Sequence, residues 1–286
     1  MGLNKEAIKI GFAYVGIVVG AGFSTGQEVM QFFTPFGLWS YIGVIISGFI
    51  LGFIGRQVAK IGTAFEAKNH ESTLQYVFGK KFSKVFDYIL VFFLFGIAVT
   101  MIAGSGSTFE QSFGIPTWLG ALIMTVLIYL TLLLDFNKIV RALGLVTPFL
   151  IIMVILIAVF YLFTGSISLG EVNSAMPETS AWKGIFWGLV YGGLAFAVGF
   201  STIVAIGGDA SKRRVSGAGA MFGGVLYAIL LALINFSLQT EYSKIKDVAI
   251  PTLNLAKGIH PWLGLVLTVI MLAVMYNTIL GLCYSF

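Results

Sequence analysis

The chain has 286 residues, of which 58% are hydrophobic and only 10% are charged, with a formal net charge of +5 and one cysteine, Cys283. About a quarter of the residues are charged in an ordinary soluble domain, so this composition excludes a water-facing globular surface. A single cysteine also excludes an intrachain disulfide and a thiolate metal cluster. The basic residues lie in short segments between apolar runs, which favours anionic lipid head groups over nucleic acid as their partner.

Eight apolar runs follow one another along the chain, and each approaches the roughly 20 residues that a helix needs to cross a bilayer about 30 Å thick. Helices are expected because lipid cannot satisfy the backbone groups of an exposed strand edge. We therefore predict an all-α integral membrane protein surrounded by the lipid bilayer. The predicted spans are residues 7–33, 37–53, 85–109, 118–134, 143–163, 182–207, 215–238 and 262–286.

Positive charge is distributed unevenly between the two sides that these spans define. Most of the 17 lysines and arginines fall on the side of the N-terminus, and the exceptions are Lys183, Lys244, Lys246 and Lys257. Positively charged connections favour the cytoplasm, so we expect a plasma-membrane protein with a cytoplasmic N-terminus.

Two connections are long, 59–84 and 239–261. The first contains an amphipathic segment, 72–81, which predicts a short helix on the membrane surface.

A four-residue repeat relates two of the spans. Gly22-Phe23-Ser24-Thr25 in the first span recurs as Gly199-Phe200-Ser201-Thr202 in the sixth, 177 residues later, and the same offset aligns the following spans and both long connections. Five helices separate the copies, so they run through the bilayer in opposite directions, as in an inverted-topology repeat. We expect a first five-helix repeat over residues 1–165 and a second, incomplete one over 182–286, which predicts a full chain two helices longer.

Glycine is concentrated in both of the spans that carry the repeat. A glycine inside a helix costs about 1 kcal/mol relative to alanine. Matching interruptions in two repeat halves predict that the first and sixth helices are broken near the bilayer midplane and line a solute site there. The alternative is that these glycines only let helices pack closely. The two clusters are Gly16, Gly20, Gly22 and Gly26, and Gly188, Gly192, Gly193 and Gly199.

Three segments, residues 20–28, 191–196 and 74–81, resemble the amino acid, polyamine and organocation transporter superfamily, whose members have the LeuT-like arrangement of five plus five helices. Within that group, residues 20–28 are most similar to the YkvI-type membrane proteins. The resemblance implies a secondary active transporter that carries an amino acid or a related small polar solute by alternating access. It implies no cofactor, and either Na⁺ or H⁺ as the coupling ion.

The expected solute site combines backbone and hydroxyl groups of the first span with the sixth span. Glycine lets a ligand approach the backbone, and the hydroxyls can bind freed backbone groups or a ligand, although bonding within their own helix is the alternative. The resemblance implies that Tyr191 and Phe196 wall the pocket, whereas packing is their other interpretation. The predicted solute-binding residues are Gly20, Ala21, Gly22, Phe23, Ser24, Thr25, Tyr191, Gly192, Gly193 and Phe196.

Glu28 is the most informative single residue, because a carboxylate inside a membrane span costs several kcal/mol unless it is compensated. It is either a proton carrier facing the solute pathway, or a carboxylate that reaches water or caps a half-helix.

The resemblance also implies a sodium site at which Asn277 and Thr278 face backbone carbonyls of Gly16 and Val19. Beyond that ion no metal is expected, since both histidines lie in connecting segments.

Two other function classes compete with transport. A non-transporting sensor or receptor would have the same fold, and the accumulation of solute in vesicles would distinguish it from a transporter. An intramembrane enzyme would need acid, base or metal groups that converge within the membrane, and the sequence shows no such constellation, so no enzymatic activity is expected. The expected partners are a small-molecule solute and lipid, and the sequence carries no signal for an oligomeric state.

Overall fold

The computed structural model describes residues 4–133, 146–167 and 170–283, and all regular elements in these ranges are helical. The first half comprises α1 (Lys5–Val18), α2 (Ala21–Thr25), α3 (Gln27–Phe32), η1 (Thr34–Trp39), α4 (Ser40–Phe49), η2 (Ile50–Ile54), α5 (Gly55–Phe65), α6 (Glu71–Phe113) and α7 (Thr117–Leu132). The second comprises α9 (Val146–Thr164), α10 (Val172–Ala175), α11 (Ala181–Gly208), α12 (Arg213–Thr240), α13 (Tyr242–Ile245), α14 (Pro251–Ile259) and α15 (Pro261–Cys283). The predicted all-α class is confirmed for this part of the chain.

Six helical stretches in the described ranges are long and apolar enough to cross a membrane. They are Thr34–Phe65, Glu71–Phe113, Thr147–Thr164, Ala181–Gly208, Arg213–Thr240 and Pro261–Cys283. The predicted first span is divided into α1, α2 and α3, and the predicted fourth span corresponds to α7, which has only 16 residues. Eight crossings and the five-plus-five arrangement therefore stay predictions. The predicted span ends at 134, 143–145 and 284–286 lie outside the described residues.

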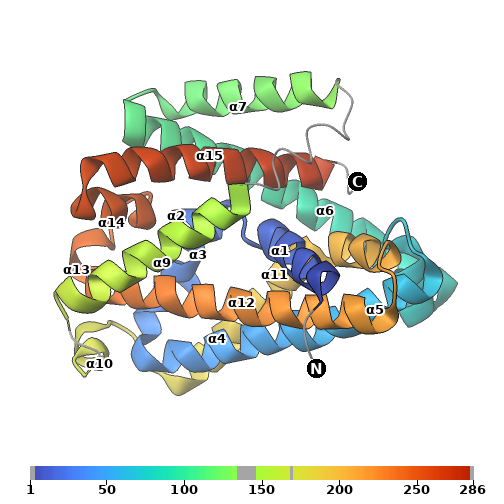
Figure 1. Cartoon of the computed structure of the whole chain (residues 1–286). Coiled ribbons are helices and arrows are strands. Elements are labelled where there is room, and N and C mark those ends of the chain that lie inside the picture. The colour runs from blue at the N-terminus through green and yellow to red at the C-terminus, as the bar shows by residue number, and fades with distance from the viewer. Residues whose placement is uncertain (1–3, 134–145, 168–169, 284–286) are drawn as a thin grey trace.

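The central layer is made of five helices: α11 packs on α4 and α5, and α12 packs on α1 and α5 (Figure 1). Helices α6, α7 and α15 form a second group, which α9 and α14 connect to the first. Figure 1 shows α10, α13 and α14 gathered at one end of the molecule, whereas α5 ends and α12 begins at the other. The long helices separate these two ends of the molecule.

The long helix α6 does not run straight from its first residue. Gly79 has φ 73° and ψ 164°, a conformation that only glycine adopts without strain, and it separates the segment that begins at Glu71 from the rest of the helix. This first segment corresponds to the amphipathic helix predicted over 72–81. Its position on a membrane surface stays a prediction.

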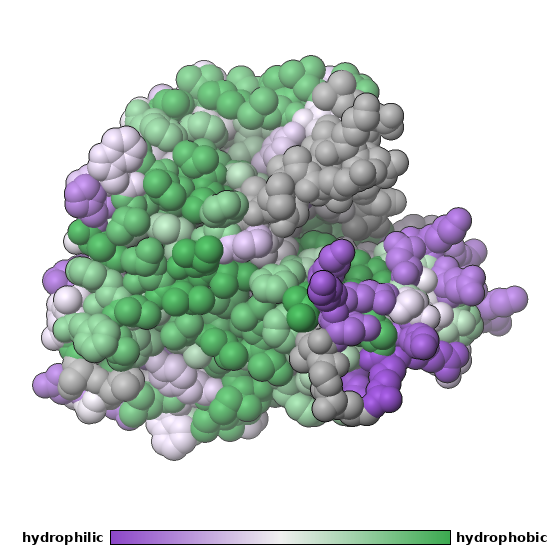
Figure 2. Space-filling view, viewed as in Figure 1, coloured by the Kyte–Doolittle hydropathy of each residue, from purple (hydrophilic) through white to green (hydrophobic). Residues whose placement is uncertain are grey.

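The outer surface is apolar between the two ends, and Figure 2 shows one wide hydrophobic face with hydrophilic residues gathered beside it. Phe163 is 81% exposed, which is normal for a residue facing lipid and costly for one facing water. Trp39, Trp118, Trp182 and Trp262 are exposed, and each lies within two residues of a helix start. Exposed tryptophans at helix ends are typical of a membrane–water boundary.

The predicted break in the sixth span is wrong, because α11 is one continuous helix over Ala181–Gly208. Two of its glycines, Gly188 and Gly192, serve helix packing instead. A Cβ atom added to Gly188 would lie 2.3 Å from the Cα of Gly43 in α4, and one added to Gly192 would lie 3.0 Å from the Cα of Ser47. Small residues bring backbones together in membranes, where this close contact stabilises helix pairs. The packing interpretation is therefore correct for Gly188 and Gly192.

We predict that Gly188→Ala lowers the thermal stability of the protein, because the added methyl group meets the α4 backbone, which can only respond by moving. Overpacking of this kind costs about 1–3 kcal/mol. Gly193→Ala is the matched control in the same helix, since no atom lies within 4 Å of a Cβ at that position. Thermal unfolding of both variants in detergent should show a loss for Gly188→Ala only. Equal melting temperatures would contradict close packing of α4 and α11.

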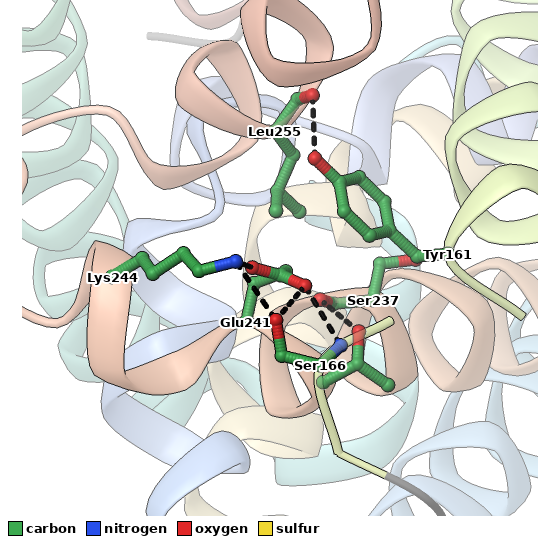
Figure 3. Close-up of polar contacts among 7 residues, drawn as sticks. Tyr161, Ser166, Ser237, Glu241, Lys244 and Leu255 are labelled. Carbon is green, nitrogen blue, oxygen red and sulfur yellow. Dashed lines mark hydrogen bonds and ion pairs between the residues drawn. The ribbon is translucent and has the colours of Figure 1, made fainter. Parts of the chain in front are cut away.

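A polar cluster fastens the end of α12 to the segment after α9 (Figure 3). Glu241 follows the last residue of α12, and its Oε1 accepts hydrogen bonds from the backbone N–H (2.9 Å) and the hydroxyl (2.8 Å) of Ser166. Lys244 Nζ lies 2.6 Å from the other carboxylate oxygen. Burial raises the pKa of Glu241, but the hydrogen bonds and the charge of Lys244 outweigh this effect and hold the pKa below its ordinary value.

We predict that Glu241→Gln destabilises the protein most at neutral pH. A carboxylate whose pKa is lowered by folding stabilises the native state above its unfolded pKa, and this contribution is lost as the pH falls through the folded pKa. The difference in melting temperature between the wild type and Glu241→Gln should therefore shrink in acid. Glu178→Gln is the control, because Glu178 pairs with Lys183 on the exposed surface. A difference that is constant with pH would contradict the assignment.

Candidate functional site

The first apolar run leaves the helix between α1 and α2. Val19 has φ −74° and ψ 79°, and Gly20 has φ −83° and ψ −168°, so neither residue is helical. Helix α2 then begins at Ala21, and the backbone N–H of Ser24 donates to the carbonyl of Gly20 (3.1 Å). The break that the glycine cluster predicts in the first span is confirmed.

A second interruption follows at Gly26, which ends α2 and precedes α3 with φ 80° and ψ −2°. Such a left-handed residue is normally glycine. The neighbouring helix α14 supports this turn, because the Thr252 hydroxyl donates to the carbonyl of Ser24 (2.5 Å). Gln27 also donates from Nε2 to the carbonyl of Ala249 (2.5 Å). Backbone groups freed by a broken membrane helix need such partners, since lipid offers none.

A cavity of about 480 Å³ opens at this interrupted helix. Helices α1 to α3 form one wall, α6 the second and α11 the third. Its lining residues are Val18, Gly20, Gly22, Gln27, Glu28, Gln31, Phe32, Phe92, Phe93, Gly96, Ile97, Thr100, Met101, Gly104, Leu194, Ala195 and Val198. Its size lies in the lower part of the range for small-molecule sites.

The carboxylate of Glu28 lies in this cavity against the backbone of α2. A Cβ atom added to Gly22 would lie 2.0 Å from the Glu28 Cδ, so the absence of a side chain at Gly22 makes room for the carboxyl group. The hydroxyl of Tyr191 in α11 donates to Glu28 Oε2 (3.1 Å), and the buried hydroxyl of Tyr227 in α12 bonds that of Tyr191. The three residues join α3, α11 and α12 by hydrogen bonds.

No lysine or arginine lines the cavity, and no basic side chain in the described part of the chain forms an ion pair with Glu28. The other polar side chains in the lining are Gln27, Gln31 and Thr100. A carboxyl group in such surroundings needs a proton, a metal cation or a positively charged ligand group to become neutral. The arrangement can therefore bind a cation or a proton beside a polar solute.

The structure brings only some of the predicted solute-binding residues to the cavity. Gly20 and Gly22 line it, and Ala21 begins α2 between them. Tyr191 does not line the cavity, but its hydroxyl donates a hydrogen bond to the lining residue Glu28. The remaining residues have other contacts. Phe23 packs on Tyr227, and Phe196 packs on Phe200. The Ser24 carbonyl accepts a hydrogen bond from Thr252, and the Thr25 hydroxyl donates one to the carbonyl of Gly22. Gly192 packs on α4, whereas Gly193 is exposed.

Among the described residues, no hydrogen bond joins the residues predicted for a sodium site. The hydroxyl of Thr278 donates to the carbonyl of Val274 within its own helix (2.9 Å), and Asn277 is only partly buried. A Cβ atom added to Gly16 would lie 2.6 Å from Thr147 Oγ1 in α9, whereas Val19 is buried at the helix break. Helices α1 and α15 do contact each other.

Sequence reasoning missed two groups of cavity residues. One is the α6 wall, in which Gly96, Thr100 and Gly104 lie four residues apart and so face the same side of the helix. The other is the pair Gln27 and Gln31, which has the same spacing in α3. Small or polar residues repeated every fourth position in an apolar run were the available signal for both groups.

A histidine link was also missed because His70 was placed in a connecting segment. Its Nε2 lies 2.7 Å from Asp87 Oδ1, and its Nδ1 lies 2.8 Å from Ser201 Oγ. Ser201 belongs to the second copy of the repeated motif, in α11. Through these two contacts His70 connects α6 to α11 at the end of the molecule opposite α14. The second motif copy therefore has a contact unlike that of the first.

These features define a helical membrane protein with several candidate spans and a mostly apolar cavity, containing Glu28, at the interruption of its first helix. The chain is homologous to "Uncharacterized membrane protein YkvI" of Bacillus subtilis (strain 168), to which it is 26% identical over 98% of this chain and 80% of that protein. It is also 27% identical to "Uncharacterized protein YyaD" of the same organism, over 52% of this chain and 43% of that protein. No protein-family model matches the chain.

We predict that the cost of Gly22→Ala depends on Glu28. The added methyl group should displace the carboxylate and break its bond to Tyr191, which lowers the melting temperature in the wild-type background. In a Glu28→Ala background the same substitution should cost little, because the group that it meets is gone. Gly104→Ala is the control in the same cavity, since its nearest neighbour, Met275 Cε, lies 4.0 Å away. Additive effects of Gly22→Ala and Glu28→Ala would contradict the contact.

Proposed function

We propose that this protein is a secondary active transporter of a small polar solute, an amino acid or a related compound. The observation that supports it is the cavity at the helix break, where Glu28 lies among apolar and neutral side chains with no basic partner in the described residues. Such an intramembrane carboxyl group is costly and is typical of an ion or solute pathway. The cavity is large enough for a solute of this class, and no cofactor is needed.

The proposed mechanism is alternating access around the interrupted first helix. The α2 segment is short and is held by side-chain contacts rather than by a continuous helix, so it can change its orientation while α11 stays intact. In this proposal residues 1–165 and 182–286 are inverted repeats, and the N-terminus is cytoplasmic in the plasma membrane. Na⁺ or H⁺ entering with the solute would neutralise Glu28, which couples the ion gradient to transport.

The solute chemistry follows from the charges of the cavity. Glu28 suits an ammonium group, and Gln27, Gln31 and Thr100 offer both donors and acceptors to a polar group. Radiolabelled amino acids and amines, tested for uptake with and without sodium, would identify the solute and separate a transporter from a sensor on the same fold.

We predict that Glu28→Gln abolishes gradient-driven accumulation and retains exchange of solute across the membrane. The substitution keeps the shape of the side chain and removes its charge, and exchange does not require the ion to be released. Uptake in proteoliposomes with separately imposed proton and sodium gradients measures both properties. Glu110→Gln, at the exposed end of α6, is the control. Undiminished accumulation by Glu28→Gln under both gradients would remove the coupling role.

A further inference from the structure

A second and larger hollow, of about 1100 Å³, lies between α5 and the first half of α12, with one residue of α6 at its edge. It is separate from the candidate site and shares no lining residue with it. Figure 2 shows hydrophilic residues gathered over the end of the molecule at which α5 ends and α12 begins, next to the hydrophobic face. Its lining residues are Arg56, Gln57, Lys60, Ile61, Ala64, Phe65, Tyr76, Arg213, Arg214, Gly217, Ala218, Met221, Phe222 and Val225.

Four cations line this hollow, which we call the basic groove, and no acidic residue does. They are Arg56 and Lys60 of α5 and Arg213 and Arg214 of α12, and none of them forms an ion pair within the described residues. Gly217 brings the two helices together here, because a Cβ atom at that position would lie 2.7 Å from Lys60 Cε. The described part of the chain thus supplies no counter-ion for these four like charges.

Carboxylates at this end of the molecule are occupied or lie outside the groove. Glu6 of α1 accepts hydrogen bonds from the backbone N–H (2.8 Å) and the hydroxyl (2.7 Å) of Ser211. Glu66 and Asp209 follow the last residues of α5 and α11 and do not line the groove. Two arginines in the first turn of α12 also add to the positive end of the helix dipole. The groove therefore has a strong and uncompensated affinity for negative charge.

The apolar part of the groove runs along α12, away from the cations. Met221 and Val225 lie 8 and 12 residues after Arg213, which places them roughly 12 and 18 Å further along the helix axis. Helix α12 is one of the candidate spans, so this direction leads into the membrane. Phe65 and Tyr76, both exposed, lie at the mouth, as aromatic side chains do at a bilayer interface.

We propose that the basic groove binds one anionic phospholipid, with its phosphate between Arg56, Lys60, Arg213 and Arg214 and an acyl chain against Met221, Phe222 and Val225. Anionic head groups bind clusters of lysine and arginine beside membrane helices. A soluble anion would satisfy the cations and leave the apolar wall uncovered, whereas a phospholipid satisfies both parts. The lipid would hold α5 against α12, two helices of the central layer.

The test uses the full chain purified in detergent and titrated with phosphatidylglycerol, with phosphatidylcholine of the same acyl chains, or with inorganic phosphate. We expect a rise in melting temperature and a one-to-one lipid adduct in native mass spectrometry with phosphatidylglycerol only. Changing Arg56, Lys60, Arg213 and Arg214 together to glutamine should weaken phosphatidylglycerol binding by at least about tenfold. If this variant fails to fold, Arg56→Gln with Lys60→Gln replaces it in the same titration.

The matched control changes Lys68, Lys80, Lys81 and Lys84 to glutamine, which removes the same charge from exposed positions outside the groove. It should keep phosphatidylglycerol binding. Val225→Ser should weaken lipid binding and leave the cations unchanged. Equal weakening in the two quadruple variants would show attraction to the general surface charge, and an equal thermal shift with inorganic phosphate would show a soluble-anion site. Either result would overturn the proposal.

Discussion

Glu28 lies where the first apolar run of the chain departs from the helix, with its carboxyl group against Gly22 and its Oε2 bonded to Tyr191. A carboxyl group at such a position is costly in an apolar bundle, and the surrounding structure is arranged around it. The break at Val19 and Gly20 opens the cavity, and Gly22 leaves the volume that the carboxylate fills. Tyr191 and Tyr227 then connect the group to two helices of the central layer.

Glycine has two distinct physical roles in this protein. In the first run it changes the path of the backbone, most clearly at Gly26, whose φ of 80° ends α2. In α11 it does not affect the path, and Gly188 instead lets α4 approach until the two backbones touch. One helix is thereby interrupted and supported by side chains such as Thr252, while the facing helix is continuous and tightly packed at Gly188. This asymmetry places the interrupted wall of the cavity on one side only.

Composition and periodicity predicted the helical class, and the first glycine cluster predicted the break beside the cavity. The sixth-span break was wrong because a glycine pattern does not show what each glycine faces. Gly192 faces Ile50 and Ser47, and Gly193 faces open space, although the two are adjacent in sequence. Contacts between distant residues were likewise not visible, as with His70 and Ser201, which are 131 residues apart. Glu28 was identified because its chemistry is unusual wherever its partners lie.

The central claim is that the cavity at the helix break is a water-accessible pathway for solute. Cysteine accessibility tests it most directly, with Cys283→Ser removing the native thiol and Thr100→Cys placing a new one in the α6 wall. A membrane-impermeant maleimide applied to sealed proteoliposomes should label Thr100→Cys, and should not label the Cys283→Ser parent, which has no thiol. The same reagent should leave Val44→Cys, buried in α4, unlabelled until the protein is denatured. Labelling of Thr100→Cys only after denaturation would contradict the account.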